Sequence, residues 1–204
     1  MNCNQWNSRV LEQLAIVDAD VSFSPKITLP CDTTELLHKL ISTVPWRAEK
    51  VNVWGRTFNQ PRLTAWYGEK GKSYTYSGIH MEPNPWTPAL LEVKLAIESI
   101  VGVVFNSALL NYYRNERDSI GFHSDDEKEL GSQPVIASFS LGEERTFVFK
   151  HKHSHTLKPA KLKLTSGSLL LMRDNTQKYW KHGIEKETKP CGPRVNLTFR
   201  QILN

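Results

Sequence analysis

Two histidines and one aspartate have the residue types and the spacing to hold a transition-metal ion. His123 and Asp125 are separated by a single residue, and a second histidine, His182, follows later in the chain. Side chains two residues apart on an extended strand point to the same face, so His123 and Asp125 are expected to lie together. Two imidazoles and one carboxylate form the facial triad of non-heme Fe(II) oxygenases, which leaves coordination positions open. These three residues are the predicted metal ligands and catalytic centre.

The C-terminal segment has a polar face that suits a dicarboxylate. A strand is predicted over residues 194–202, and the side chains on one of its faces are polar: Arg194, Asn196, Thr198 and Arg200. Guanidinium groups bind carboxylates through paired hydrogen bonds, so two arginines on one face suit a molecule such as 2-oxoglutarate. Taken singly, the histidines could be ordinary strand residues and the arginines surface charges. Their agreement in chain order and in face favours a functional site.

Together these segments resemble the AlkB family of Fe(II)- and 2-oxoglutarate-dependent nucleic-acid demethylases, in particular the branch that repairs alkylated DNA duplexes. The resemblance runs from about residue 45 to the C-terminus, and the first forty residues match less well. The segments that carry it are residues 110–113, 121–127, 134–142, 167–172 and 193–200. It implies the cofactors Fe(II), 2-oxoglutarate and O2. It also implies an enzyme that oxidatively demethylates 1-methyladenine and 3-methylcytosine in DNA, releasing formaldehyde, succinate and CO2.

The resemblance also implies roles around 2-oxoglutarate. Arg194 matches the family arginine that pairs with the far carboxylate, and Asn196 and Arg200 match positions near the chelating end. Asn111 and Tyr113 lie two residues apart on another predicted strand, so they share a face and can add hydrogen bonds to the same anion. Ordinary strand packing is the alternative explanation for these last two residues.

Five residues match substrate-reading positions of the family. A methylated base must be flipped out of a duplex to reach an iron between two sheets. Trp54 matches the apolar finger that fills the vacated stack, and Tyr74 and Tyr76 match aromatic residues of a nucleotide-recognition lid. Arg62 is predicted to contact a phosphate or to cap the lid, and Asp126 to lie near the exocyclic amine of the flipped base. Core packing of the three aromatic residues, and a solvated loop charge at Asp126, are the alternatives.

A basic segment over residues 149–158, with Lys161 and Lys163 beyond it, is predicted to form a hairpin tip whose lysines contact a phosphate backbone. Three alternating histidines in the same segment lack a carboxylate or cysteine to complete a metal site. The finger and this hairpin favour duplex DNA as the partner. An RNA demethylase, a protein hydroxylase of the same superfamily, and a non-catalytic nucleic-acid-binding jelly roll remain as alternatives.

Bulk properties are consistent with a globular protein that has a polyanionic partner. The chain has 204 residues, 39% of them hydrophobic and 23% charged, and its net charge is +5. Three scattered cysteines, Cys3, Cys31 and Cys191, argue against a disulfide framework or a zinc site and favour a reducing compartment. We expect no signal peptide and no membrane span, a cytoplasmic location in a bacterium or a nuclear one in a eukaryote, and a monomer.

The periodicity predicts an α+β fold that is mainly β, with a β-sandwich or jelly-roll core, and the resemblance implies the double-stranded β-helix form of the jelly roll. An extended arm covers residues 1–30, helices begin after Asp32 and Thr87, and the second helix stops at Gly102. Strands are predicted over residues 62–67, 73–77, 108–114, 120–123, 135–141, 145–150, 160–164, 168–173, 180–185 and 194–202. We expect one domain over residues 1–204. Residues 1–107 supply the arm, helices and nucleotide-recognition lid, and residues 108–204 supply the catalytic core.

Overall fold

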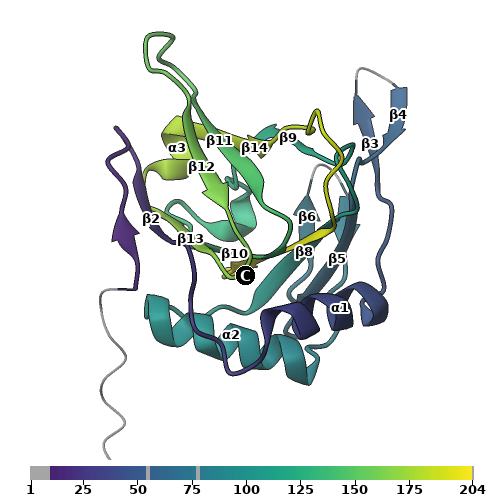
Figure 1. Ribbon diagram of the computed structural model, residues 1–204. Coiled ribbons are helices and arrows are strands. Elements are labelled where there is room, and N and C mark those ends of the chain that lie inside the picture. Colours follow the sequence, from purple (N-terminus) through teal and green to yellow (C-terminus); the bar gives the residue numbers. More distant parts are fainter. Residues whose placement is uncertain (1–9, 54–55, 77–78, 204) are drawn as a thin grey trace, which may run out of the picture.

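Two antiparallel sheets face each other in the computed structural model, which describes residues 10–53, 56–76 and 79–203, without the side chains of residues 51–53, 56–57, 74–76 and 79–81 (Figure 1). The larger sheet has the strand order β1 (Glu12–Gln13), β2 (Asp20–Ser24), β13 (Leu169–Arg173), β10 (Ile136–Gly142), β15 (Arg194–Arg200), β8 (Ser107–Tyr113), β5 (Leu63–Gly68). The smaller sheet has the order β12 (Ala160–Leu164), β11 (Arg145–His151), β14 (Trp180–Ile184), β9 (Ile120–His123). This arrangement confirms the predicted jelly-roll core.

Two helices cover the outer face of the larger sheet, below it in Figure 1. Helix α1 (Thr33–Thr43) begins where Asp32 Oδ1 accepts hydrogen bonds from the backbone N–H groups of Thr34 and Glu35, at 2.8 and 2.9 Å. Helix α2 (Pro88–Val101) is capped by Thr87 and ends at Gly102, whose φ of 70° is a left-handed conformation that favours glycine. Both predicted helices are confirmed.

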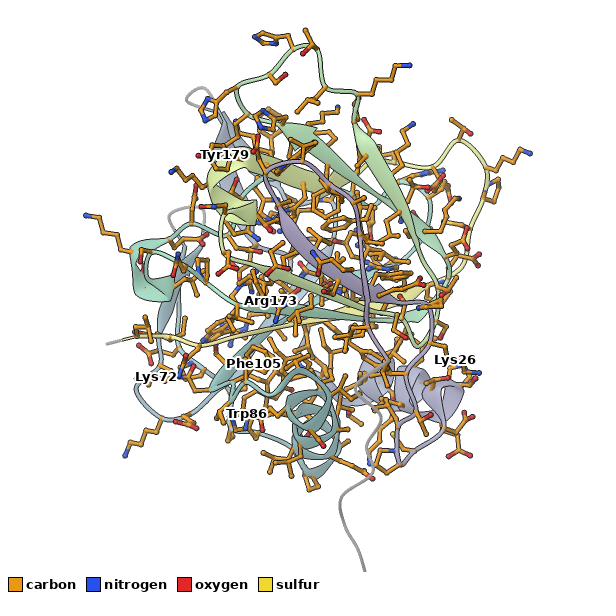
Figure 2. The ribbon with its side chains drawn as sticks, turned by 90° about the vertical axis from the view of Figure 1, so that its left-hand side faces the viewer. Lys26, Lys72, Trp86, Phe105, Arg173 and Tyr179 are labelled. Atoms are coloured by element: carbon orange, nitrogen blue, oxygen red, sulfur yellow. The ribbon has the colours of Figure 1, made fainter. Side chains whose placement is uncertain are left out.

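The apolar residues form two layers, one on each face of the larger sheet. The outer layer packs α1 and α2 against the sheet and includes Phe105, Leu197 and Phe199. Trp86 stacks on Phe199 with ring centroids 6.4 Å apart, and Figure 2 shows Trp86 and Phe105 beside α2. The inner layer fills the space between the two sheets and includes Leu109, Phe147, Phe149 and Trp180, among others. The residues of the site described below also lie between the sheets.

The N-terminal arm differs from its prediction. Residues 20–24 form β2, which pairs with β13 so that Asp20 lies opposite Arg173 and Ser24 opposite Leu169. Strands β1 and β5 also join the larger sheet, so a boundary at residue 107 does not separate lid from core. Strand β2 shows the alternation of apolar and polar residues expected of a strand with one buried face, but its partner lies about 150 residues away.

Smaller elements complete the described part of the chain. Two short hairpins, β3 (Lys50–Val53) with β4 (Arg56–Asn59) and β6 (Tyr74–Tyr76) with β7 (Ile79–Met81), lie outside the two sheets. A single-turn helix α3 (Thr176–Tyr179) and the 3-10 turn η1 (Lys128–Leu130) connect strands. Among the described residues, no helix has the length and apolar composition needed to cross a lipid bilayer.

Candidate active site

The two predicted metal-binding histidines are cross-strand neighbours in the smaller sheet. His123 ends β9 and lies directly opposite His182 in β14, with ring centroids 4.5 Å apart. The alternation argument placed Asp125 on the same strand as His123. In the structure Asp125 lies beyond the strand, because β9 ends at His123 and the chain then turns. The turn still brings the Asp125 carboxylate to within 3.5 Å of His182 Nε2. Directly opposed residues on paired strands are natural partners for a shared ligand.

The ligand atoms of His123, Asp125 and His182 all lie within 4.8 Å of one another. His123 Nδ1 donates a hydrogen bond to the backbone oxygen of Gly121 at 2.9 Å, which leaves the Nε2 lone pair available for a metal. Two imidazoles and a carboxylate that converge on one point fit Fe(II). The residues present could therefore hold the ion that the sequence predicts.

Asp125 is ionised and compensated inside the protein. Its side chain is 1% exposed, and its Oδ1 accepts a hydrogen bond from Arg200 Nη2. Burial raises the pKa of Asp125, but the Arg200 guanidinium and the hydrogen bond with His182 outweigh it, so the pKa lies well below its usual range. The backbone N–H of Asp125 donates to Gln177 Oε1 at 2.9 Å, which fixes the turn. The carboxylate is therefore held in its metal-binding form.

His123 is held in its metal-binding form as well. Burial and, to a smaller extent, the neighbouring His182 together lower the pKa of His123 to about 4, although Asp125 opposes both effects. The imidazole is neutral at neutral pH, as a metal ligand must be. Neither His123 nor Asp125 therefore has to lose a proton before a metal binds at neutral pH.

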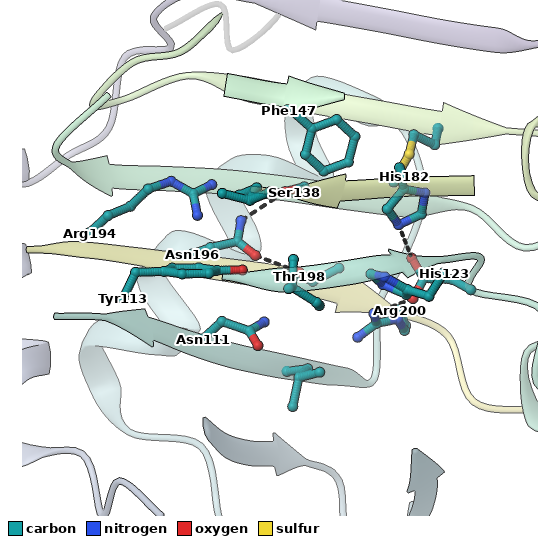
Figure 3. Close-up of a pocket in the computed structure, with 15 residues that line it drawn as sticks. Asn111, Tyr113, His123, Ser138, Phe147, His182, Arg194, Asn196, Thr198 and Arg200 are labelled. Atoms are coloured by element: carbon teal, nitrogen blue, oxygen red, sulfur yellow. Dashed lines mark hydrogen bonds and ion pairs between the residues drawn. The ribbon is translucent and has the colours of Figure 1, made fainter. Parts of the chain in front are cut away.

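The other end of the pocket carries a buried positive charge without a carboxylate. Arg194 is 1% exposed, and its Nη2 donates to the neutral Ser140 hydroxyl at 2.9 Å. Its Nε and Nη1 have no hydrogen-bond partner among the described residues. Burial lowers the pKa of Arg194 to about 10, while the Tyr113 hydroxyl raises it. A charged guanidinium buried beside neutral groups is suited to an anionic ligand, and Figure 3 shows it with Tyr113 at the end opposite His123 and His182.

The middle of the pocket is lined by amides and hydroxyls. Asn196 Nδ2 donates to Ser138 Oγ at 2.8 Å and to the Phe139 backbone oxygen at 3.0 Å, and Asn196 Oδ1 accepts from Thr198 at 2.8 Å (Figure 3). The alternation on β15 places four residues on the pocket face: Arg194, Asn196, Thr198 and Arg200. This is the face expected from the sequence, and the apolar residues between them enter the outer core.

Asn111 and Tyr113 also line the pocket, from β8. Arg62 is 4% exposed, and its Nε donates to Asn111 Oδ1 at 2.7 Å. In the described structure this buried guanidinium contacts the pocket residue Asn111, and its phosphate or lid contact stays a prediction. Here it orients the Asn111 amide, a role that the sequence analysis did not anticipate.

The remaining substrate-reading predictions fall largely outside the described structure. Trp54 and the side chains of Tyr74 and Tyr76 lie outside the described residues. The side chain of Asp126 is 62% exposed, next to Asp125 in the chain, and pairs with Lys152 Nζ at 3.1 Å. Asp126 is therefore at the surface beside the pocket, where it can meet a substrate.

Three residues near the site were missed by sequence reasoning. Gln177 and Lys152 hold the turn that carries Asp125 and Asp126, and Lys152 Nζ also donates to the Gln177 backbone oxygen at 2.7 Å. The segment around Gln177 gave no signal beyond a turn. Arg145 did give a signal, because it begins the predicted strand 145–150 on the same face as Phe147 and Phe149. A charged residue on an inward face is unusual and indicates a buried interaction.

Comparison with known proteins identifies a family and several relatives. A family model described as the 2OG-Fe(II) oxygenase superfamily matches residues 20–200. Alpha-ketoglutarate-dependent dioxygenase alkB homolog 3 from Homo sapiens is 47% identical over 175 residues, which are 82% of this chain and 60% of the relative. DNA oxidative demethylase ALKBH2 from Mus musculus is 42% identical over 160 residues, which are 76% of this chain and 67% of the relative.

The fold has a counterpart among solved structures. A structure described as "The structure of OsALKBH1" matches with a TM-score of 0.64 and 17% identity, covering 94% of this chain and 99% of the other. At this identity the match concerns the fold alone. The chain spans about 60% of the length of human alkB homolog 3, so this relative has further sequence outside the shared region.

Proposed function

This chain belongs to the 2OG-Fe(II) oxygenase superfamily and, within it, to the AlkB family, and from that premise we propose that it is a demethylase of N-alkylated nucleic-acid bases. The observation that carries the proposal is the convergence of His123, Asp125 and His182 within 4.8 Å, in the same pocket as the uncompensated Arg194. One end of this pocket suits Fe(II) and the other suits a carboxylate. That combination is what a 2-oxoglutarate-dependent oxygenase requires.

The residues divide the work between the two ends. His123, Asp125 and His182 would hold the iron, and Arg194 and Tyr113 would receive the far carboxylate of 2-oxoglutarate. Asn111, Asn196 and Arg200 would orient the rest of the co-substrate. Bound there, the iron and 2-oxoglutarate, together with O2, would supply the oxidising chemistry that turns an N-methyl group into formaldehyde, with succinate and CO2 as the other products. The inner apolar layer between the two sheets would shield the pocket from water.

For the substrate we propose DNA that carries 1-methyladenine or 3-methylcytosine, with the damaged base flipped into the site. These lesions are cationic and pair poorly, so they are attracted to a carboxylate and cost less to extract than a normal base. Asp126 is exposed beside the ligand Asp125 and supplies such a carboxylate. Mouse ALKBH2, 42% identical to this chain, is named a DNA oxidative demethylase, which supports the choice of DNA.

Duplex binding is supported by the charge of the smaller sheet. Strands β11, β12 and β14 carry four exposed lysines on the outer face of the smaller sheet: Lys150, Lys161, Lys163 and Lys181. Lysines on such a face can neutralise phosphates along a nucleic-acid backbone. The tip of the β11–β12 hairpin projects beyond both sheets at the top of Figure 1. The finger role of Trp54 and the stacking roles of Tyr74 and Tyr76 rest on the resemblance of their sequence segments.

The test is a reconstituted assay on a duplex oligonucleotide with one 1-methyladenine. Protein, Fe(II), 2-oxoglutarate and the oligonucleotide are mixed without oxygen, and the mixture is then opened to air. The mass of the oligonucleotide is measured by mass spectrometry. We expect the loss of one methyl group, dependent on both cofactors and abolished by His182→Ala. Formation of succinate without any loss of methyl would support the proposed 2-oxoglutarate site and contradict the proposed nucleic-acid substrate.

Matched substrates and variants sharpen this assay. The same lesion in single-stranded DNA and in RNA separates the duplex-DNA proposal from an RNA demethylase. Trp54→Ala should lower the rate on duplex more than on single strands, because only a duplex needs its gap filled. Leu95→Ala is the control, since Leu95 is a 60% exposed apolar residue on α2, away from both sheets' inner faces. An equal relative loss of rate on duplex and on single strands in Trp54→Ala would contradict the finger role.

A further inference from the structure

A second buried arginine lies behind the co-substrate end of the pocket. Arg145 begins β11 and is 1% exposed. Its Nη2 donates to the backbone oxygen of Asp118 at 2.8 Å and to that of Glu185 at 2.7 Å. Its Nε faces Glu187 Oε1 at 3.3 Å, and its Nη1 has no hydrogen-bond partner among the described residues. Arg145 does not line the pocket, and the proposed demethylation does not require it as a ligand of the metal or of 2-oxoglutarate.

Arg145 ties together the loops at the ends of three strands. Asp118 lies between β8 and β9, and its carboxylate holds Arg114, just after β8, through two hydrogen bonds of 2.7 and 2.8 Å. Glu185 directly follows β14. The same guanidinium therefore links the strand that carries Tyr113, the strand that carries His123 and the strand that carries His182. A planar group with five donors can make such contacts in fixed directions, which a lysine cannot.

The charge of Arg145 also reaches the pocket. Its Cζ lies 5.6 Å from the centroid of the Tyr113 ring, and Arg194 Cζ lies 5.1 Å from the same centroid. Aromatic faces attract cations, so one ring carries two guanidinium groups beside it. The Arg145 charge lowers the pKa of Arg194, while Tyr113 raises it. Glu187, the carboxylate nearest to Arg145, is 37% exposed, so solvent weakens its compensation.

We propose that Arg145 is a positioning residue of the 2-oxoglutarate site, which holds the Tyr113 ring beside Arg194 and adds positive charge at the end that receives the far carboxylate. This inference rests on the co-substrate proposed above. Two nearby buried cations repel each other while the site is empty, and a carboxylate between Arg194 and Tyr113 relieves that repulsion. Arg145 therefore strengthens the preference for a ligand with a second carboxylate.

The test compares 2-oxoglutarate with 2-oxopentanoate, which has the same carbon chain but lacks the far carboxylate. Affinities are measured by calorimetry on protein loaded with Mn(II), so that no turnover occurs. Arg145→Met removes both the positive charge and the planar set of N–H donors. Arg145→Lys keeps the charge but loses the planar set of donors. Arg117→Met and Arg117→Lys are the matched controls. Arg117 lies on the β8–β9 loop, which Arg145 contacts through Asp118, but the Arg117 side chain is 84% exposed.

We expect Arg145→Met to weaken 2-oxoglutarate binding about tenfold, the scale on which outer partners act at ligand sites, with 2-oxopentanoate unchanged. Arg145→Lys should show the same selective loss to a smaller extent, and it decides the outcome if Arg145→Met fails to fold. Equal weakening of both ligands, or unchanged selectivity in folded Arg145→Lys, would overturn the role of Arg145. If the unmodified protein does not prefer 2-oxoglutarate over 2-oxopentanoate, the proposed co-substrate itself is wrong.

Discussion

The two ends of the pocket handle buried charge in opposite ways. At the metal end, the Asp125 carboxylate is paired with Arg200 and lies 3.5 Å from His182 Nε2. At the far end, the hydrogen-bond partners of Arg194 among the described residues are two hydroxyl groups, those of Ser140 and Tyr113, and no carboxylate. Both ends are equally buried, at about 1% exposure for Asp125 and Arg194. The metal end is electrostatically complete on its own, and the far end is completed by its ligand.

This difference teaches which charges serve folding and which serve binding. A buried ion pair stabilises the protein only while both partners are present, and the loss of one leaves an uncompensated charge. A buried charge without a partner costs stability until a ligand neutralises it. Substitutions at the metal end should therefore weaken both the fold and metal binding. Substitutions at the far end should weaken ligand binding and leave the fold intact or more stable.

The largest effect is expected from Asp125→Ala. Removal of the carboxylate takes away a metal ligand and leaves Arg200 buried without its counter-charge, which costs about 3–5 kcal/mol of unfolding free energy. Metal binding, followed by calorimetry with Mn(II), should be lost, and demethylation with it. Glu144→Ala is the control, because this carboxylate is 42% exposed, lies outside the pocket and pairs with Lys163 at the surface. Normal stability of metal-free Asp125→Ala would break the contrast between the two ends.

Arg194→Met should show the opposite pattern. The affinity for 2-oxoglutarate should fall about 10- to 100-fold, the worth of a charged hydrogen bond, because the far carboxylate loses its partner. The metal-free protein should unfold at an equal or higher denaturant concentration, because a buried and uncompensated charge has been replaced by an apolar chain. Chemical denaturation and calorimetry on the same preparation measure both quantities. A destabilised fold would show that Arg194 is compensated in the absence of ligand.

The sequence predicts these two ends unequally well. On β15, strict alternation of polar and apolar residues was enough to place Arg194 and Arg200 on one face, because a strand with two different faces has only one register that buries the apolar set. The strand predictions from residue 107 onward agree with the structure to within about two residues for the same reason. The distinction between compensated and uncompensated arginines was not predictable, because both have the same sequence signature.

What the sequence could not supply are contacts between segments far apart in the chain. Gln177 reaches Asp125 across 52 residues from a segment that reads only as a turn, and β2 pairs with β13 across about 150 residues. The hydrogen bond from Arg62 to Asn111 was not predicted, because the two residues are 49 positions apart. A local pattern fixes which face a side chain takes, but the partner on that face depends on the packing of the sheets.

A smaller effect at the metal end should appear in the pH dependence of the metal-free protein. Burial lowers the pKa of His123 to about 4 from 6.5, so between these values the unfolded chain binds a proton that the folded protein does not. The unfolding free energy should therefore be highest above pH 6.5 and fall as the pH drops toward 4. His123→Gln should flatten this slope in denaturation series, whereas His153→Gln, on the exposed hairpin, should leave it unchanged. An unchanged slope in His123→Gln would mean that His123 is not held neutral.

The smallest effect is expected from Ser140→Ala at the far end. The hydroxyl accepts one hydrogen bond from Arg194 at 2.9 Å, and its loss frees a further N–H without altering the charge. A neutral hydrogen-bond partner contributes about 1 kcal/mol, so the affinity for 2-oxoglutarate should fall only about fivefold. Ser22→Ala is the control, because this buried serine on β2 does not line the pocket and its hydroxyl donates to Gln13 instead. Calorimetry with 2-oxoglutarate measures the change. A loss as large as that of Arg194→Met would mean that Ser140, and not the incoming carboxylate, sets the position of the arginine, and the far end would then be built in advance like the metal end.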